Sequence, residues 1–338
     1  MHLLVGNPTA QSGRNARRID EARRLLHEAG LDHDFLPTRP EGKTVGDVAK
    51  ALSGGAYRVV VAMGGDGTFA EVAKGLLAGG TDTTMAMLPT GTANDQGKSF
   101  GLDSDESSLA HNVSVLAEGH TAPLDAGRIT AFGALDDVLK VDHFFDSAGW
   151  GISALALRMR NEDRRLVGGI PIVRELYRDQ LVYAGAILRA FAKSWVQEQP
   201  FEATVQTPAG HQYFEGLTDL VVKNTRIYAG AWVLDATGSP EDGEMELVPF
   251  RGQAEWAARG IVHHEQIPVN EPDLNEVGLS LSASIRAPWF DIRLHDRPLG
   301  QPVESQIDGE EWIGSQRVRI DVLRHALRLV VPVSLSSR

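Results

Sequence analysis

Short apolar runs alternate with amphipathic stretches over the first third of the chain. Runs with the length of buried strands lie at residues 3–5, 33–37, 59–63 and 84–88. Stretches that repeat apolar residues at helical spacing lie at residues 14–29, 44–52, 68–77 and 104–118. Because strands that alternate with helices form parallel, doubly wound sheets, residues 1–123 are predicted to be an α/β domain.

The pattern changes from residue 124 onward. Short strand-like runs separated by turn residues lie at residues 124–132, 138–145, 201–207, 211–214, 219–224 and 244–250. This spacing predicts a second domain, an antiparallel β-sandwich, over residues 124–316. Residues 170–196 form a longer apolar segment at mostly helical spacing, which favours a helix packed on the sheet.

Composition limits the class of protein. The 338 residues, 42% of them hydrophobic, suffice for two domains with cores, and the absence of Cys excludes disulfides, Cys-ligated zinc and thiol nucleophiles. A formal net charge of -12 argues against general nucleic-acid binding and makes any attachment to an anionic membrane local. The apolar run at residues 3–5 has no basic leader, and no window approaches the roughly 18 apolar residues of a membrane span. We therefore expect a cytoplasmic protein without a transmembrane segment.

A glycine-rich turn follows the strand at residues 59–63 and opens the next helix. Gly64, Gly65 and Gly67 let the backbone approach a ligand closely, and the free N–H groups of a helix start would face an anion such as phosphate. Asp66 lies in the same turn. A carboxylate beside a phosphate is repulsive unless a cation lies between them, so Asp66 points to Mg²⁺. An ordinary tight turn is the alternative.

A second turn repeats this arrangement after the strand at residues 84–88. Gly91 breaks the strand, and Asn94 and Asp95 lead into another helix. Two such turns at the carboxyl ends of neighbouring strands would lie side by side, where open α/β sheets place their ligands. The pair of turns therefore favours a nucleotide-phosphate site over two unrelated turns.

The two turns carry the motifs GGDGT at residues 64–68 with Glu71, and LPTGTAND at residues 88–95. Together they resemble the catalytic domain of the diacylglycerol kinase and sphingosine kinase lipid-kinase superfamily, in its soluble bacterial form. The first motif is shared with NAD kinases and loosely with phosphofructokinases, and the second separates the families. The resemblance implies an NAD-kinase-like and phosphofructokinase-like first domain, a lipid-substrate domain at residues 124–316, and a C-terminal tail at residues 317–338 that returns to the first domain.

The same resemblance implies that ATP binds at the strand ends of the first domain. The loops after the first two strands and both glycine turns supply the expected contacts, namely Asn7, Pro8, Thr9, Thr38, Gly64, Gly65, Asp66, Gly67, Thr68, Glu71, Gly91, Thr92 and Asn94. It also leaves a second interpretation for residues 170–196, as the border of a lipid pocket.

The segment SQIDGEE at residues 305–311 resembles the part of the family that closes the active site. Phosphoryl transfer to an alcohol requires ATP oriented by backbone donors, Mg²⁺ on the phosphates and a carboxylate within reach of the hydroxyl. We therefore assign Glu310 as the general base, with Asp308 and Asp66 as the other catalytic residues. A hairpin turn is the alternative.

Further segments complete the expected metal network. Asp125 lies in the LDAG segment that resembles a magnesium strand, and Asp242 lies in an Asp-Gly turn that holds a structural Mg²⁺ in bacterial members. Most members carry Asn where this chain has Asp146, which leaves the role of that residue open. The expected metal carboxylates are Asp66, Asp95, Asp125, Asp308 and Asp242. Crowded carboxylates raise one another's pKa unless a cation is present, so we expect strong magnesium dependence.

Three functions are compatible with these motifs. The first is an ATP-dependent lipid kinase of phospholipid biosynthesis that acts on diacylglycerol to give phosphatidic acid, with sphingoid or other lipid alcohols as further substrates. The second is an NAD-kinase-like enzyme, against which residues 88–95 count. The third is a non-catalytic lipid-binding module, which needs no such set of carboxylates. Expected partners are a lipid at the membrane surface, with peripheral attachment there, and a second copy of the chain at an exposed sheet edge.

Overall fold

The computed structural model describes residues 1–91, 93–155, 157–158, 200–228, 232–235, 237–252, 255, 282–295 and 302–336. The predictions for Thr92 and for the apolar segment at residues 170–196 lie outside the described residues. No described helix is long and apolar enough to cross a bilayer.

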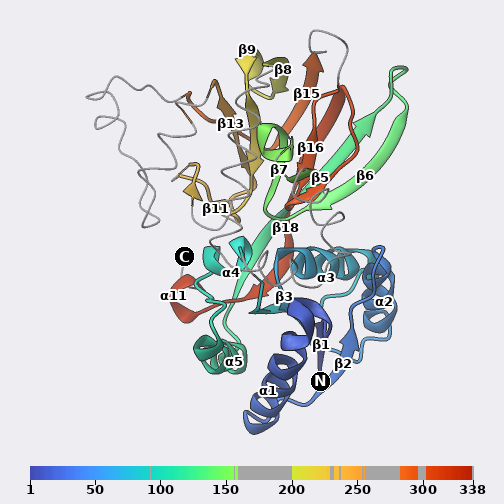
Figure 1. Cartoon of the computed structure of the whole chain (residues 1–338), viewed down its shortest axis with the longest axis vertical. Coiled ribbons are helices and arrows are strands. Elements are labelled where there is room, and N and C mark those ends of the chain that lie inside the picture. The colour runs from blue at the N-terminus through green and yellow to red at the C-terminus, as the bar shows by residue number, and fades with distance from the viewer. Residues whose placement is uncertain are drawn as a thin grey trace, which may run out of the picture.

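A parallel sheet forms the first part of the chain, as predicted. Its strands pair in the order β2-β1-β3-β4 and have the bounds β1 (His2–Gly6), β2 (His33–Pro37), β3 (Val59–Gly64) and β4 (Thr84–Pro89). The strand residues Leu4, Val5, Val60 and Val61 are fully buried because helices cover the sheet (Figure 1). The sheet therefore brings the carboxyl ends of β1, β3 and β4 to one edge.

The helices begin and end close to the predicted positions. They are η1 (Ala10–Gly13), α1 (Arg14–Glu28), α2 (Lys43–Leu52), α3 (Asp66–Gly79), α4 (Asp95–Ser99), η2 (Glu106–Ser108), α5 (Leu109–Glu118) and α11 (Val333–Ser336). The prediction of a helix over residues 104–118 is wrong at its start, because residues 106–108 form a 3-10 turn and the α-helix begins at Leu109.

Two long antiparallel strands connect the parallel sheet to the β-rich part. They are β5 (Thr121–Phe132) and β18 (Arg317–Val330). The end of β18 pairs in parallel with β4 through Leu329 and Met85, and its beginning pairs with β15 (Trp289–His295). The result is one sheet in the order β2-β1-β3-β4-β18-β15-β8-β9, with β5 and β6 beside β18 (Figure 1).

The C-terminal tail differs from its prediction. The sequence predicts two strands there, at residues 318–323 and 327–332, whereas the structure has the single strand β18 with a register shift between Leu323 and Leu327. β5 begins before residue 124 and continues into the β-rich part, so it crosses the predicted domain boundary. The boundaries at residues 123 and 316 stay a prediction.

A second sheet packs against the β-rich end of the first. Its antiparallel order is β14-β13-β10-β7-β16-β17, with β7 (Ser147–Gly151), β10 (Asp219–Lys223), β13 (Met245–Phe250), β14 (Ile285–Ala287), β16 (Ser305–Ile307) and β17 (Glu310–Glu311). Trp150 and Leu220 from this sheet share a core with Phe290 and Ile320 from the first sheet. The predicted antiparallel sandwich is therefore confirmed.

The remaining strands are β6 (Val138–Phe144), β8 (Phe201–Thr207) and β9 (Gly210–Leu217) in the first sheet, and β11 (Ile227–Tyr228) and β12 (Trp232–Val233), which pair with each other. Among the described strands β6 pairs with β5 alone, and its apolar side chains Val138, Leu139 and Val141 are exposed. Such an edge is the element that a homodimer would require, and the dimer itself stays a prediction.

One glycine in β5 tests the packing of this strand. Gly127 lies opposite Phe144, and a Cβ at Gly127 would come within 2.2 Å of the Phe144 ring. We expect Gly127→Ala to lower the free energy of unfolding by about 1–3 kcal/mol, measured by urea denaturation, because the ring has to move. Gly46→Ala is the matched control. Beyond its chain neighbours and the backbone of its own helix, no atom of the described residues lies within 4 Å of a Cβ placed on this helical glycine, so we expect a gain of about 0.5–1 kcal/mol. Equal stability of the two variants would contradict the packing at Gly127.

Candidate active site

The two glycine turns lie against each other at the ends of β3 and β4. The N–H of Thr90 donates to the carbonyl of Gly64 over 2.8 Å. A Cβ on Gly91 would lie 2.5 Å from the Cα of Gly65, and a Cβ on Gly65 would lie 3.2 Å from the Cα of Gly91. Contacts this short exclude a side chain at Gly91, so the approach of the two turns requires glycine.

Asn94 fixes the shape of the second turn. Its φ of 51° is in the left-handed region, which Asn tolerates better than most residues. Its side-chain carbonyl accepts the N–H of Gly91 over 3.0 Å, and its side-chain amide donates to the Gly91 carbonyl over 2.6 Å. The buried Asn94 side chain is therefore used on the turn itself.

Asp66 opens helix α3 from the first turn. Gly65 precedes the helix in an extended conformation, and a Cβ on Gly64 would lie 2.3 Å from Oγ1 of Thr68. Oδ1 of Asp66 accepts the N–H of Gln96 over 3.1 Å, which joins α3 to α4. Burial raises the pKa of Asp66, and the nearby charge of Asp146 raises it further. The start of α3 thus carries a carboxylate whose ionised form is destabilised by desolvation.

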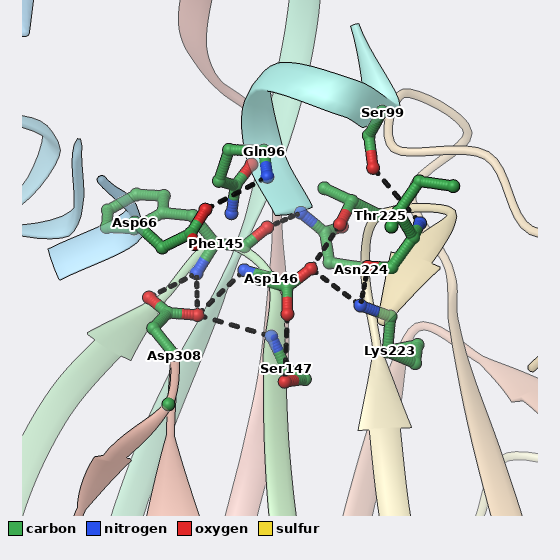
Figure 2. A network of polar contacts seen from close by, with 12 residues as sticks. Asp66, Gln96, Ser99, Phe145, Asp146, Ser147, Lys223, Asn224, Thr225 and Asp308 are labelled. Atoms are coloured by element: carbon green, nitrogen blue, oxygen red, sulfur yellow. Dashed lines mark hydrogen bonds and ion pairs between the residues drawn. The ribbon is translucent and has the colours of Figure 1, made fainter. Parts of the chain in front are cut away.

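Asp308 reaches the same region from the turn between β16 and β17. Its Oδ1 accepts the N–H groups of Phe145, Asp146 and Ser147 over 3.1, 2.8 and 3.2 Å, and its Oδ2 accepts that of Phe145 over 3.0 Å. Burial raises the pKa of Asp308 to about 7, and the carboxylate of Asp146 acts in the same direction, while the amide donors lower it. Figure 2 shows Asp308 and Asp66 on either side of Phe145.

Glu310 extends from β17 toward the first turn of α3. Its Oε1 lies 3.9 Å from the position that a Cβ would take on Gly67. Burial raises the pKa of Glu71 on α3, and the charge of Glu310 adds to this rise, while Lys74 lowers it. Lys74 forms an ion pair with Asp142 of β6 over 2.7 Å. The structure therefore brings Glu310, Glu71 and the helix start together.

Asp125 has a different environment. Its side chain is fully buried, and its Oδ1 and Oδ2 accept the N–H groups of His325 and Gly243 over 2.6 and 2.7 Å. His325 lies in the irregular part of β18 with a φ of 50°. Burial raises the pKa of Asp125, while these two amides lower it. Asp125 thus joins the β18 irregularity to the turn that contains Gly243.

The other predicted metal carboxylates are also placed by the fold. Asp242 accepts the N–H of Glu244 over 2.9 Å and forms an ion pair with Arg286. Asp95 is buried at the first position of α4. Among the described residues, no three His, Asp or Glu side chains are arranged to hold a metal ion by themselves. Mg²⁺ commonly takes one or two carboxylates and completes its shell with water and phosphate. Asp66, at the start of α3 beside the glycine turns, suits that kind of donor set.

The predicted loops of the nucleotide site lie at the ends of β1 and β2. Oδ1 of Asn7 accepts the N–H of Thr9 over 3.0 Å and its hydroxyl over 2.8 Å, so this loop, which includes Pro8, has a defined turn. The N–H of Thr38 donates to the carbonyl of Gly6 over 3.0 Å. These loops thus border the same sheet edge as the glycine turns, and Thr92 lies outside the described residues.

Two further residues lie here that no sequence motif predicted. Lys223 forms a buried ion pair with Asp146, and Gln96 joins α4 to Asp66. A signal for Lys223 was present, because a lysine directly after the apolar residues Leu220, Val221 and Val222 must be paired if the strand is buried. Gln96 acts through its main chain, which leaves no signal in the residue type.

Comparison with known proteins agrees with these motifs. Residues 1–129 match the family model described as the diacylglycerol kinase catalytic domain. A diacylglycerol kinase from Staphylococcus saprophyticus is 29% identical to the chain over 128 residues. A probable lipid kinase YegS-like from Klebsiella pneumoniae is 35% identical over 117 residues. The resemblance to the diacylglycerol kinase superfamily is confirmed. These matches cover 38% and 35% of this chain, and 41% and 38% of the two relatives.

Longer matches have lower identity. A probable lipid kinase YegS-like from Pseudomonas putida is 26% identical over 309 residues, which are 91% of this chain and 88% of that protein. The structure of a diacylglycerol kinase from Bacillus anthracis str. Sterne aligns with a TM-score of 0.69 at 18% identity, over 99% of this chain and 98% of that one. Yeast NADH kinase aligns with a TM-score of 0.50 at 12% identity, over 99% and 84% of the two chains. The two structures confirm the fold class that the superfamily implied.

The raised pKa of Asp308 predicts a pH dependence of stability. The folded chain binds this proton more tightly than the unfolded chain, so protonation favours folding, and this benefit is lost as the pH rises from about 4 to about 7. In buffer with a metal chelator, we expect the free energy of unfolding to fall over that range by up to about 4 kcal/mol. The free energy of unfolding of the Asp308→Asn variant should fall less over the same range, as measured by urea denaturation at several pH values.

The control for this experiment is Asp82→Asn, whose carboxylate is 96% exposed. We expect its stability to follow that of the unsubstituted chain across the pH range. If Asp308→Asn also follows that curve, then Asp308 does not titrate in this window.

Proposed function

We propose that the chain is an ATP-dependent lipid kinase that transfers the γ-phosphate of ATP to a lipid hydroxyl. The observation that carries this proposal is the position of Glu310. It places a carboxylate beside Gly67, at the N-terminus of α3 and next to the paired glycine turns, although Glu310 belongs to β17 of the second sheet and Gly67 to a helix of the first part of the chain. A base and a phosphate-binding helix start are thus adjacent.

The phosphate end of ATP would be held by main-chain donors. The turn at residues 64–67 and the first N–H groups of α3 provide a positive helix terminus, and the turn at Gly91 lies against it. The loop of Asn7, Pro8 and Thr9 and the residue Thr38 border the same edge. Because Gly65 and Gly91 carry no side chain, the two turns can lie against each other, which brings both of them to the same place at this edge.

Glu310 would act as the general base. It accepts the proton of the lipid hydroxyl while the hydroxyl oxygen forms its bond to the γ-phosphorus and the bond to the ADP oxygen breaks. Its exposed position on β17 leaves room for an acceptor, in contrast to the buried Asp308. Asp308 would hold the segment at residues 145–147 in place through its hydrogen bonds to the main chain.

Magnesium is part of this proposal. Mg²⁺, when bound, neutralises charge on the transferring phosphates, and Asp66 with Asp95 would hold it, since both lie at helix starts beside the turns. Asp125 and Asp308 have oxygen atoms engaged by main-chain amides, so we assign them to the surrounding framework. Asp242 stays a candidate for a separate structural Mg²⁺.

We further propose diacylglycerol as the acceptor, with phosphatidic acid as the product in phospholipid biosynthesis. The names of the relatives from Staphylococcus saprophyticus and Klebsiella pneumoniae support a lipid acceptor, and only the first specifies diacylglycerol. Sphingoid or other lipid alcohols are the alternative acceptors. A lipid acceptor requires access to a membrane surface, so we propose a cytoplasmic protein with peripheral attachment.

Two other functions are weaker. An NAD-kinase-like activity shares the first glycine motif and the fold, and the yeast NADH kinase structure supports the fold alone. A non-catalytic lipid-binding module would not require Glu310 beside the start of α3. These alternatives differ from the proposal in what becomes labelled when the chain is incubated with labelled ATP and magnesium.

The proposal predicts that Glu310 controls the chemical step. With labelled ATP, magnesium and diacylglycerol in mixed micelles, we expect Glu310→Gln to lower kcat by about 10²–10⁴-fold, because the amide cannot accept the proton. Glu311→Gln is the matched control, since Glu311 is the exposed neighbour in the same strand. Its kcat should stay within about twofold of that of the unsubstituted chain.

The labelled product identifies the reaction. Label in phosphatidic acid supports diacylglycerol as the acceptor, and label in another lipid changes only the substrate. Label in NAD would contradict the lipid-kinase proposal. Equal losses in Glu310→Gln and Glu311→Gln would show that Glu310 is not the base.

A further inference from the structure

A buried ion pair adjoins the proposed active site. Nζ of Lys223 lies 2.5 Å from Oδ1 of Asp146, and the two side chains are only 3% and 6% exposed. Removing two charges from water is costly, and a buried pair is retained without a large penalty only when further hydrogen bonds satisfy both groups. Both Lys223 and Asp146 therefore require further hydrogen-bond partners.

Both members of the pair are satisfied by neighbouring groups. Lys223 also donates to the carbonyl of Ile227 over 2.8 Å and lies 5.2 Å from the ring centre of Tyr228. Asp146 accepts the hydroxyl of Ser147 over 3.0 Å and the hydroxyl of Thr225. The charged groups of Lys223 and Asp146 thus contact each other and further hydrogen-bond partners in a defined geometry, as Figure 2 shows.

The pair is attached directly to the loops of the proposed site. The main-chain N–H of Asp146 donates to Asp308 over 2.8 Å, and its carbonyl accepts the N–H of Asn224 over 2.8 Å. The carboxylate of Asp146 is also close enough to raise the pKa of both Asp66 and Asp308. A change of charge at Asp146, or at Lys223 beside it, therefore alters the electrostatic potential at Asp66 at the start of α3.

The charges in this cluster give Lys223 a specific role. The carboxylate of Asp146 lies close enough to those of Asp66 and Asp308 to raise the pKa of both, and the ammonium ion of Lys223 contacts Asp146. The ammonium ion balances one of the carboxylates. The charge of Asp66 then remains to be balanced, together with that of Asp95 at the start of α4, by a divalent cation.

We propose that Lys223 is a positioning residue that balances the charge of Asp146 and thereby sets the affinity of the active site for a divalent cation. The inference rests on the proposed function in that the cation is the magnesium used there. Loss of the ammonium ion makes the cluster more negative and strengthens cation binding. Loss of the Asp146 carboxylate leaves the ammonium ion unbalanced and weakens cation binding. Loss of both charges restores the balance.

Magnesium binding to the full chain, without nucleotide or lipid, tests the proposal. The midpoint of thermal unfolding is measured during a MgCl₂ titration and gives an apparent Kd. We expect Lys223→Met to lower this Kd and Asp146→Asn to raise it, each by about three- to tenfold, from the attraction or repulsion of one unit charge. The double variant Asp146→Asn/Lys223→Met should return to within about twofold of the unsubstituted chain, because the cluster has its original net charge.

Lys43→Met is the matched control. It removes the same charge from an exposed lysine that is paired with Glu41 on the surface, and the magnesium Kd should not change. A purely structural ion pair would lower the unfolding temperature of both single variants without moving the two Kd values in opposite directions.

Each outcome decides the proposal. Opposite shifts in the single variants, with restoration in the double variant, support it. If Lys223→Met does not fold, a raised Kd in Asp146→Asn together with restoration in the double variant supports it. It is overturned if Asp146→Asn binds magnesium like the unsubstituted chain, if the double variant remains shifted, or if the unsubstituted chain shows no magnesium-dependent shift. Intact magnesium binding without transfer of phosphate to any lipid would overturn the proposed function and leave the role of Lys223 standing.

Discussion

The pairing of β5 with β18 is the constraint on which the arrangement of the chain depends. These strands run from the parallel sheet into the sandwich, so the two parts share one continuous hydrogen-bonded ladder. A strand pair of this length limits the bending of one part against the other more than a single linker would. The segment that follows β6 therefore arrives near the first turn of α3 with a fixed direction.

Carboxylates that accept main-chain N–H groups complete this framework. Asp308 holds the segment between β6 and β7, and Asp125 holds the irregular part of β18 against the turn at Gly243. Each uses an acidic side chain to close a loop that has no regular strand partner. In a site that also handles phosphate, such carboxylates are stable only when amide dipoles or cations surround them. This requirement explains why the acidic residues of the site lie at helix starts and loop amides.

The parts of the site that are local in sequence were predictable. The glycine turns directly follow two apolar strands that are close in sequence. The sequence therefore predicted that both turns lie at strand ends and that they contact each other. The division into a doubly wound sheet and an antiparallel sandwich was likewise visible in the change of periodicity. Contacts between distant segments were less accessible. Asp125 bonds to a main-chain amide 200 residues away, and main-chain amides carry no residue signature. The metal role predicted for Asp125 rested on the resemblance of its segment to the superfamily, which carries no information about these amides. The pairing of Asp146 with Lys223 was also missed, since the residues are 77 positions apart and only the fold of β10 beside β7 brings them together.

The contact between β18 and β4 has a consequence for how the protein is made. The parallel sheet is built from residues 2–89, yet the free side of β4 is covered by a strand that begins at residue 317. During synthesis the edge of β4 therefore stays open until nearly the whole chain has left the ribosome. Pairings between such distant segments form slowly, and open apolar edges attract other chains in the meantime. The sheet of the first part is thus completed only when the strand at residues 317–330 arrives.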